Sequence, residues 1–101
     1  MAYLGEQIDA HVSAAAGDDP ELFLELRAAF VESARRQLDL LERSRCDANW
    51  QVAALRLKSL AATFHAAQLI ELADEVLLAA PGEPGVLRRI GALIDELSLP
   101  S

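Results

Sequence analysis

The chain has 101 residues, of which 52% are hydrophobic, 25% are charged and only 5% are aromatic. This length suits one domain, and a composition rich in leucine and alanine favours helices over strands. The formal net charge of −7 argues against nucleic acid as a partner, because nucleic-acid-binding domains usually carry a basic surface.

The cysteine content and the apolar runs predict a cytoplasmic chain that has no membrane partner. Cys46 is the only cysteine, so no intrachain disulfide can form. The N-terminal run MAYLGEQIDAHV has acids where a signal peptide needs positive charge, and no apolar run approaches the roughly 20 residues of a membrane span. We therefore expect a single soluble domain over residues 1–101.

Turn-forming runs at 17–20, 46–49 and 81–85 separate segments whose apolar residues have helical spacing. A short helix is expected over about residues 4–15, and Gly17 is suited to end it in a left-handed conformation. Asp19 and Pro20 then provide a cap and a first turn for a helix that is predicted to run to about Arg45. Its buried stripe is predicted to be Phe23, Leu26, Phe30, Ala34, Leu38 and Leu41.

Three further helices follow, the first capped by Asp47 and the last started by Pro84. Their predicted inner faces are Trp50, Ala54, Leu57, Ala61 and Phe64, then Leu69, Leu72, Ala73, Val76 and Ala80, then Leu87, Ile90, Leu93, Ile94 and Leu97. Four amphipathic helices joined by short turns predict an all-α fold, namely an antiparallel up-down four-helix bundle with a short extra N-terminal helix.

One run on the third helix carries a further pattern. The run Leu55-Arg56-Leu57-Lys58-Ser59 is followed by small residues, and it comes after a Gly-Asp-Asp-Pro-Glu entry, a long helix and an Asp-x-x-Trp turn. In this order the chain resembles the histidine-containing phosphotransfer (HPt) domain, whose third helix bears His-x-Leu-Lys-Gly. The resemblance covers nearly the whole chain, and it rests on the layout and on this one degenerate motif.

The resemblance implies a module of two-component phosphorelay signalling that binds a receiver domain or a histidine kinase. Leu55 replaces the phosphoacceptor histidine and Ser59 replaces the glycine one turn on, so the chain is expected to be a non-phosphorylated pseudo-HPt domain. Leu55 lies about 200° around the helix from Leu57 and should therefore face solvent. The predicted partner-binding residues are Gln51, Leu55, Arg56, Lys58, Ser59 and Ala62.

The sequence leaves two alternatives open. His65, or less plausibly His11, could carry phosphate instead. However, ten helical residues separate His65 from Leu55 by about 15 Å and about 80°, so the docking pose would have to change. The chain could also be a helical dimerisation module unrelated to phosphorelay, in which the N-terminal helix or a second copy covers Leu55. It could thus be a monomer or a homodimer.

Catalytic and metal-binding patterns are not found. The chain has no His-x-x-x-His, no Glu-x-x-His, no paired cysteines and no glycine-rich phosphate loop before a helix, so we expect no metal, no cofactor and no enzyme activity. The acids Glu71, Asp74 and Glu75 are expected to form a solvated face. No histidine stands at a pairing distance in the sequence from the candidate nucleophiles Ser13, Ser33, Ser44, Ser59, Thr63 and Cys46.

Overall fold

The computed structural model describes the backbone of residues 4–98 and the side chains of residues 6–97. The described chain forms α1 (Leu4–Ala16), α2 (Pro20–Arg43), α3 (Asp47–Thr63), α4 (Ala67–Leu78) and α5 (Pro84–Ser98). The prediction of an all-α fold is therefore confirmed. The expected domain over residues 1–101 also includes three residues at each end that lie outside the described backbone.

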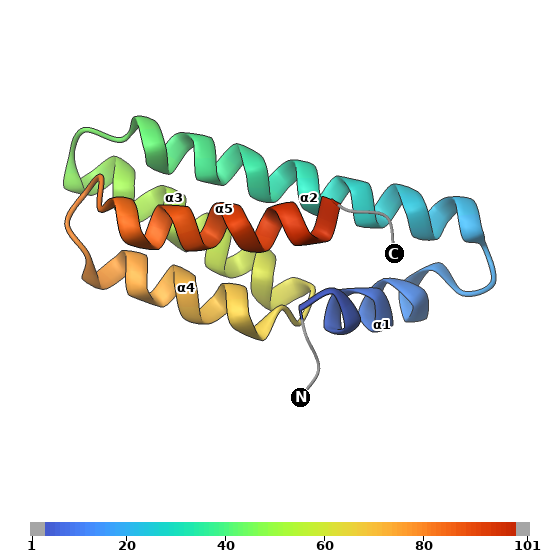
Figure 1. The fold of residues 1–101 in the computed structure, drawn as a ribbon. Coiled ribbons are helices and arrows are strands. Elements are labelled where there is room, and N and C mark those ends of the chain that lie inside the picture. The colour runs from blue at the N-terminus through green and yellow to red at the C-terminus, as the bar shows by residue number, and fades with distance from the viewer. Residues whose placement is uncertain (1–3, 99–101) are drawn as a thin grey trace.

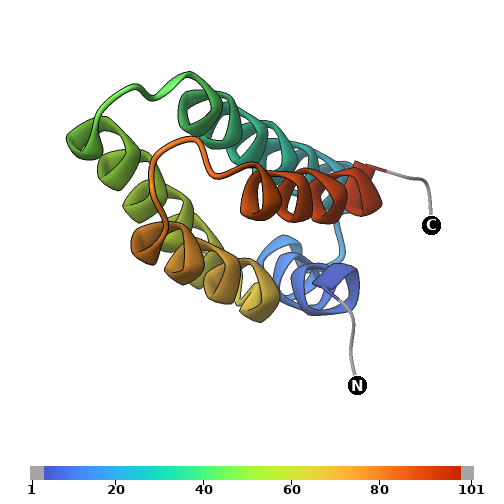
Figure 2. The same cartoon turned by 60° about the vertical axis from the view of Figure 1, so that its left-hand side comes forward.

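Helices α2 to α5 lie side by side, and the chain reverses its direction from each helix to the next (Figure 1). α2 packs against α3 and α5, α3 packs against α4, and α4 packs against α5. α2 has 24 residues against 17 in α3, so its N-terminal part extends beyond the others. α1 lies beside this extension and contacts α2, α4 and α5 (Figure 2).

The ends of α2 follow from local hydrogen bonds. The Asp19 carboxylate accepts from the backbone N–H groups of Glu21 and Leu22 at 3.0 and 3.1 Å, as an N-cap does. Gly17 has φ 65°, which confirms the predicted left-handed stop. α2 ends at Arg43 rather than Arg45, because Ser44 leaves the helical conformation and its hydroxyl donates to the Leu40 carbonyl at 2.7 Å.

The prediction that Asp47 caps α3 is wrong. α3 begins at Asp47 itself, and the preceding Cys46 holds the cap position with an extended backbone and no capping hydrogen bond from its side chain. The Cys46 carbonyl accepts the first helical bond, from the Trp50 N–H at 3.1 Å. The Asp47 carboxylate still lies in the first turn, where its charge suits the positive end of the helix dipole.

The core lies between the five helices, and most of the predicted stripes face it. Trp50 joins α3 to α4, because its indole N–H donates to the Val76 carbonyl at 2.8 Å inside the core. The prediction that Ala80 lies on the inner face of α4 is wrong, because Ala80 follows the end of this helix and is exposed. α1 adds Ile8 and Val12, which the sequence did not single out. The larger fully buried side chains are Ile8, Val12, Phe30, Leu41, Leu57, Leu69, Val76, Ile90, Ile94 and Leu97.

Candidate functional site

The outer face of α3 presents an aliphatic side chain to solvent. Leu55 is 50% exposed, whereas Leu57, two residues further on, is fully buried, so the predicted orientation is confirmed. Gln51, Ser59 and Ala62 lie within about 40° of Leu55 around the helix and are exposed as well. We call Gln51, Leu55, Ser59 and Ala62 the α3 strip.

α1 does not cover the α3 strip. Within the described residues α1 contacts α2, α4 and α5 but not α3. It lies beside the N-terminal extension of α2, beyond the end of α3 (Figure 1). The alternative in which the N-terminal helix buries Leu55 is therefore wrong, and the strip is open to a partner.

Lys58 and Arg56, the two predicted basic residues, turn to opposite sides of the α3 strip. Lys58 is half-buried, and its ammonium group pairs with the Asp74 carboxylate of α4 at 2.7 Å. Arg56 lies on the α2 side and is exposed, and it forms no ion pair with any residue from 6 to 97. Arg56 is therefore the cation of this face that can meet a partner without first breaking an internal ion pair.

The acids of α4 form a solvent-accessible face, as expected, and two of them also pair with neighbouring helices. Asp74 pairs with Lys58 of α3, and Glu75 pairs with Arg89 of α5. The hydrogen bond that Arg89 donates to the Glu75 carboxylate raises the pKa of Arg89. The two acids connect α4 to α3 and to α5, while Glu71 is exposed.

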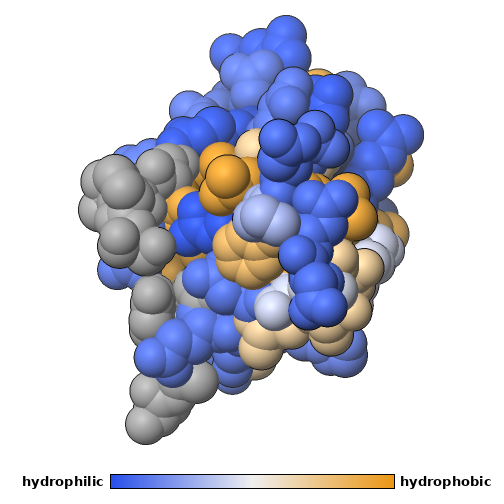
Figure 3. All heavy atoms as spheres, turned by 90° about the vertical axis from the view of Figure 1, so that its right-hand side faces the viewer, coloured by the Kyte–Doolittle hydropathy of each residue, from blue (hydrophilic) through white to orange (hydrophobic). Residues whose placement is uncertain are grey.

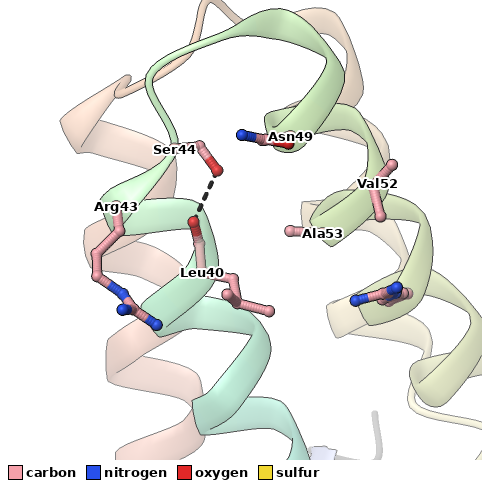
Figure 4. Close-up of a pocket in the computed structure, with 7 residues that line it drawn as sticks. Leu40, Arg43, Ser44, Asn49, Val52 and Ala53 are labelled. Carbon is pink, nitrogen blue, oxygen red and sulfur yellow. Dashed lines mark hydrogen bonds between the residues drawn. The ribbon is translucent and has the colours of Figure 1, made fainter.

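A pocket of about 430 Å³ opens between α2 and α3, next to the α3 strip. Leu40 and Ala53 point into the gap from opposite helices, and Ser44 and Asn49 lie at the end near the α2–α3 turn (Figure 4). Its complete lining is Leu40, Arg43, Ser44, Asn49, Val52, Ala53 and Arg56. We call this the α2–α3 pocket. The sequence does not predict this pocket, because its lining comes from two helices whose relative rotation is set only by tertiary packing.

His65 lies away from the α3 strip, just after the end of α3. Its φ of 56° is left-handed. The N–H of His65 donates to the Ala62 carbonyl at 3.2 Å, and the N–H of Ala66 donates to the Ala61 carbonyl at 2.8 Å. This is the Schellman motif that ends many helices, with histidine at the position where glycine is usual. A side chain there costs about 1 kcal/mol relative to glycine.

The two histidines lie together, which the sequence spacing did not predict. The His65 ring is 4.7 Å from the His11 ring of α1 between centroids, with 51° between the ring planes. His11 also meets Phe64 edge-on at 5.6 Å, and Phe64 contacts Phe30 at 4.7 Å. The imidazole of His65 thus faces α1 rather than the α3 strip, and a partner docked on the strip would not meet it in line.

Comparison with known proteins adds no relative. No family model, curated protein sequence or solved structure matches the chain. Among the described residues, no helix is long and apolar enough to cross a membrane. The site itself is an exposed helix face with an aliphatic centre and an arginine-rimmed pocket beside it.

Proposed function

We propose that the chain is a pseudo-HPt module of two-component signalling that binds a receiver domain or a histidine kinase. It would do so through the α3 strip and the neighbouring α2–α3 pocket, without carrying phosphate on α3. In this interpretation α2 to α5 form an antiparallel up-down four-helix bundle, and α1 is the short extra helix that the HPt resemblance implies.

One observation carries the proposal: Leu55 faces solvent at the position where the resemblance puts the phosphoacceptor imidazole. Leu57 and Lys58 of the shared motif occupy different environments, because Leu57 is buried and Lys58 pairs with Asp74. The fold-supporting part of the motif is thus kept while the reactive group is replaced. An aliphatic group cannot accept a phosphoryl group, but it can anchor a helix that packs against it.

The α2–α3 pocket supports docking because it combines apolar walls with positive charge. Leu40 and Val52 are 37% and 47% exposed, and with Leu55 they form an aliphatic surface that spans both helices. Arg43 and Arg56 rim this surface. An aliphatic centre with an arginine rim is the composition that protein interfaces favour. The partner surface should therefore present apolar side chains flanked by carboxylates.

The test is a titration of purified receiver domains and kinase domains against the wild-type protein and two leucine variants. Leu55→Asp puts a charge at the centre of the proposed interface and should weaken binding roughly 30-fold or more. Leu78→Asp is the matched control, because Leu78 is 91% exposed at the end of α4 and lies outside the surface. It should bind like wild type.

Three results would contradict the proposal. Equal affinity of Leu55→Asp and wild type would remove the α3 strip as the docking surface. An acid-labile phosphoryl group on the wild-type protein that is lost in His65→Ala would establish an active phosphotransfer protein. A wild-type homodimer that Leu55→Asp dissociates, with no receiver or kinase binding, would identify a dimerisation module.

A further inference from the structure

Within the described part of the chain, the ring nitrogens of His11 and His65 have no hydrogen-bond partner. Neither His11 nor His65 forms a side-chain hydrogen bond or an ion pair with any residue from 6 to 97. A neutral imidazole has one unprotonated nitrogen, which can bind a metal ion when no protein group donates to it. Here His65 is exposed and His11 is half-buried, so solvent and dissolved ions reach the pair.

The backbone at His65 also points to a role for its side chain. His65 holds the left-handed position that ends α3, where glycine would fit without strain. A strained residue is a reason to look for function, because the conformation persists only where something offsets its cost. The ring contact with His11 is the one distinctive feature that glycine could not provide.

We propose that His11 and His65 together bind one divalent transition-metal ion of the zinc, nickel or copper class. Neutral imidazole nitrogen suits these ions. A ring nitrogen lies roughly 1.1 Å from its ring centre, so two imidazoles on one ion at 2.0–2.1 Å have centroids roughly 4.5–5.3 Å apart. The observed 4.7 Å falls inside this interval.

The site would be an open one. Among the described residues no group of three or more histidine, cysteine, aspartate or glutamate side chains could surround an ion. The chain therefore supplies two ligands, and water completes the coordination. The formal net charge of −7 favours the approach of a cation.

A bound ion would add a second link between α1 and the α3–α4 turn, where the Gln7 side chain of α1 already accepts the Ala67 N–H at 3.2 Å. Among the described residues the backbones of α1 and α3 do not approach each other, and His11 of α1 meets the segment after α3 through the rings of Phe64 and His65. Coordination would add two metal–nitrogen bonds to this ring contact, so it would hold α1 more firmly against the turn between α3 and α4. The inference is independent of receiver binding, because the α3 strip contributes no ligand.

The test is calorimetric titration of the full chain with zinc chloride and with nickel chloride, together with thermal melts at each metal concentration. Wild type should bind one ion per chain, and its Tm should rise by about 10 °C at a hundredfold excess over Kd. Binding should weaken on acidification, because protons compete for the imidazoles. Cys46→Ser controls for the exposed thiol and should bind like wild type.

His65→Gly is the decisive variant, because it removes one metal ligand and also relieves the strain of the left-handed backbone at residue 65. Without metal its Tm should equal or exceed that of wild type, while its metal affinity should fall at least about tenfold. His11→Phe keeps an aromatic ring on α1 and should lose the same affinity. Unchanged metal binding in His65→Gly, or no binding by wild type below about 1 mM metal, would overturn the proposal. A markedly lower metal-free Tm of His65→Gly would show that the ring is needed for packing and would overturn it too.

Discussion

At position 55 the chain holds a side chain that the core does not need. Leu55 is 50% exposed and lies opposite the fully buried Leu57, so its replacement leaves the packing of α3 unchanged. Substitutions at such surface positions usually change the free energy of unfolding by no more than about 0.5 kcal/mol. The position can therefore be altered to test function without loss of the fold.

Leu55→His restores the imidazole that the HPt resemblance implies, but we expect it to transfer phosphate poorly. Ser59 lies one turn further along the same strip, where the resemblance implies glycine, and its side chain restricts the approach of a receiver to position 55. Transfer from a phosphorylated receiver should be slow in Leu55→His and at least about tenfold faster in Leu55→His/Ser59→Gly. Phosphohistidine formation measures the rate. Rapid transfer by the single variant would show that Ser59 is no obstacle.

At the scale of the helix, the start of α2 depends on one carboxylate. Asp19 accepts two backbone hydrogen bonds, from Glu21 at 3.0 Å and from Leu22 at 3.1 Å. Asp19→Ala should lower the free energy of unfolding by about 1 kcal/mol, measured by urea denaturation. Asp19→Asn keeps an oxygen that can accept these hydrogen bonds, so its free energy of unfolding should fall much less. Equal losses in the two variants would mean that charge rather than capping stabilises α2 here.

The contact between α3 and α4 depends on a buried donor. The Trp50 indole donates to the Val76 carbonyl at 2.8 Å, and this carbonyl also accepts the N–H of Ala79 at 3.1 Å. Trp50→Phe removes the donor and leaves a gap in the core, so unfolding free energy should fall by about 2–3 kcal/mol. Thermal melts measure the loss. Phe64→Leu removes aromatic contacts but no hydrogen bond and should cost less.

Apolar segments also reach the surface at the ends of the helices. The end of the molecule where α1 turns into α2 shows apolar atoms enclosed by hydrophilic ones (Figure 3). Leu22 and Leu24 of α2 are 37% and 64% exposed. Single exposed leucines are common in soluble proteins and require no partner. The α3 strip differs because its exposed leucine adjoins a pocket with an arginine rim.

At the scale of the whole molecule, the spacing of apolar residues predicted which face of each helix is buried. It did not predict which side chains of neighbouring helices meet. The spacing of Phe30, Ala34 and Leu41 identifies one face of α2, because a helix that buries a stripe must repeat it every three or four residues. The orientation of Leu55 followed from the same rule. By contrast, the ion pair between Lys58 and Asp74 depends on how α4 packs against α3, which the spacing within one helix does not contain.

The placement of α1 was the least predictable feature. Its short apolar pattern gives no sign of which helices it meets, and the meeting of His11 with His65 depends on that placement. The α2–α3 pocket could not be predicted for a related reason. A pocket forms where two helices diverge or carry small side chains against each other, and periodicity within one helix does not contain that information.

One side chain holds α1, α2 and α5 together, which gives a prediction for the whole molecule. The guanidinium of Arg27 in α2 donates through Nε to the Asp9 carboxylate of α1 at 2.9 Å. Through Nη1 it donates to the Leu97 carbonyl in the last turn of α5. α5 has no basic residue in its own last turn, so Arg27 supplies the positive charge that its negative end favours.

Arg27→Met should therefore lower the free energy of unfolding by about 2 kcal/mol, because it leaves a half-buried carboxylate and a helix-end carbonyl without their donor. For a chain of this size the Tm should fall by roughly 10 °C. Asp95→Asn is the matched control, since Asp95 pairs with Arg35 of α2 at 3.1 Å but is 71% exposed. Exposed ion pairs contribute little to stability, so the free energy of unfolding of this variant should fall by no more than about 0.5 kcal/mol. Similar losses in Arg27→Met and Asp95→Asn would mean that burial and the bond to α5 add nothing, and that α1 is held by its other contacts, among them the buried Ile8 and Val12.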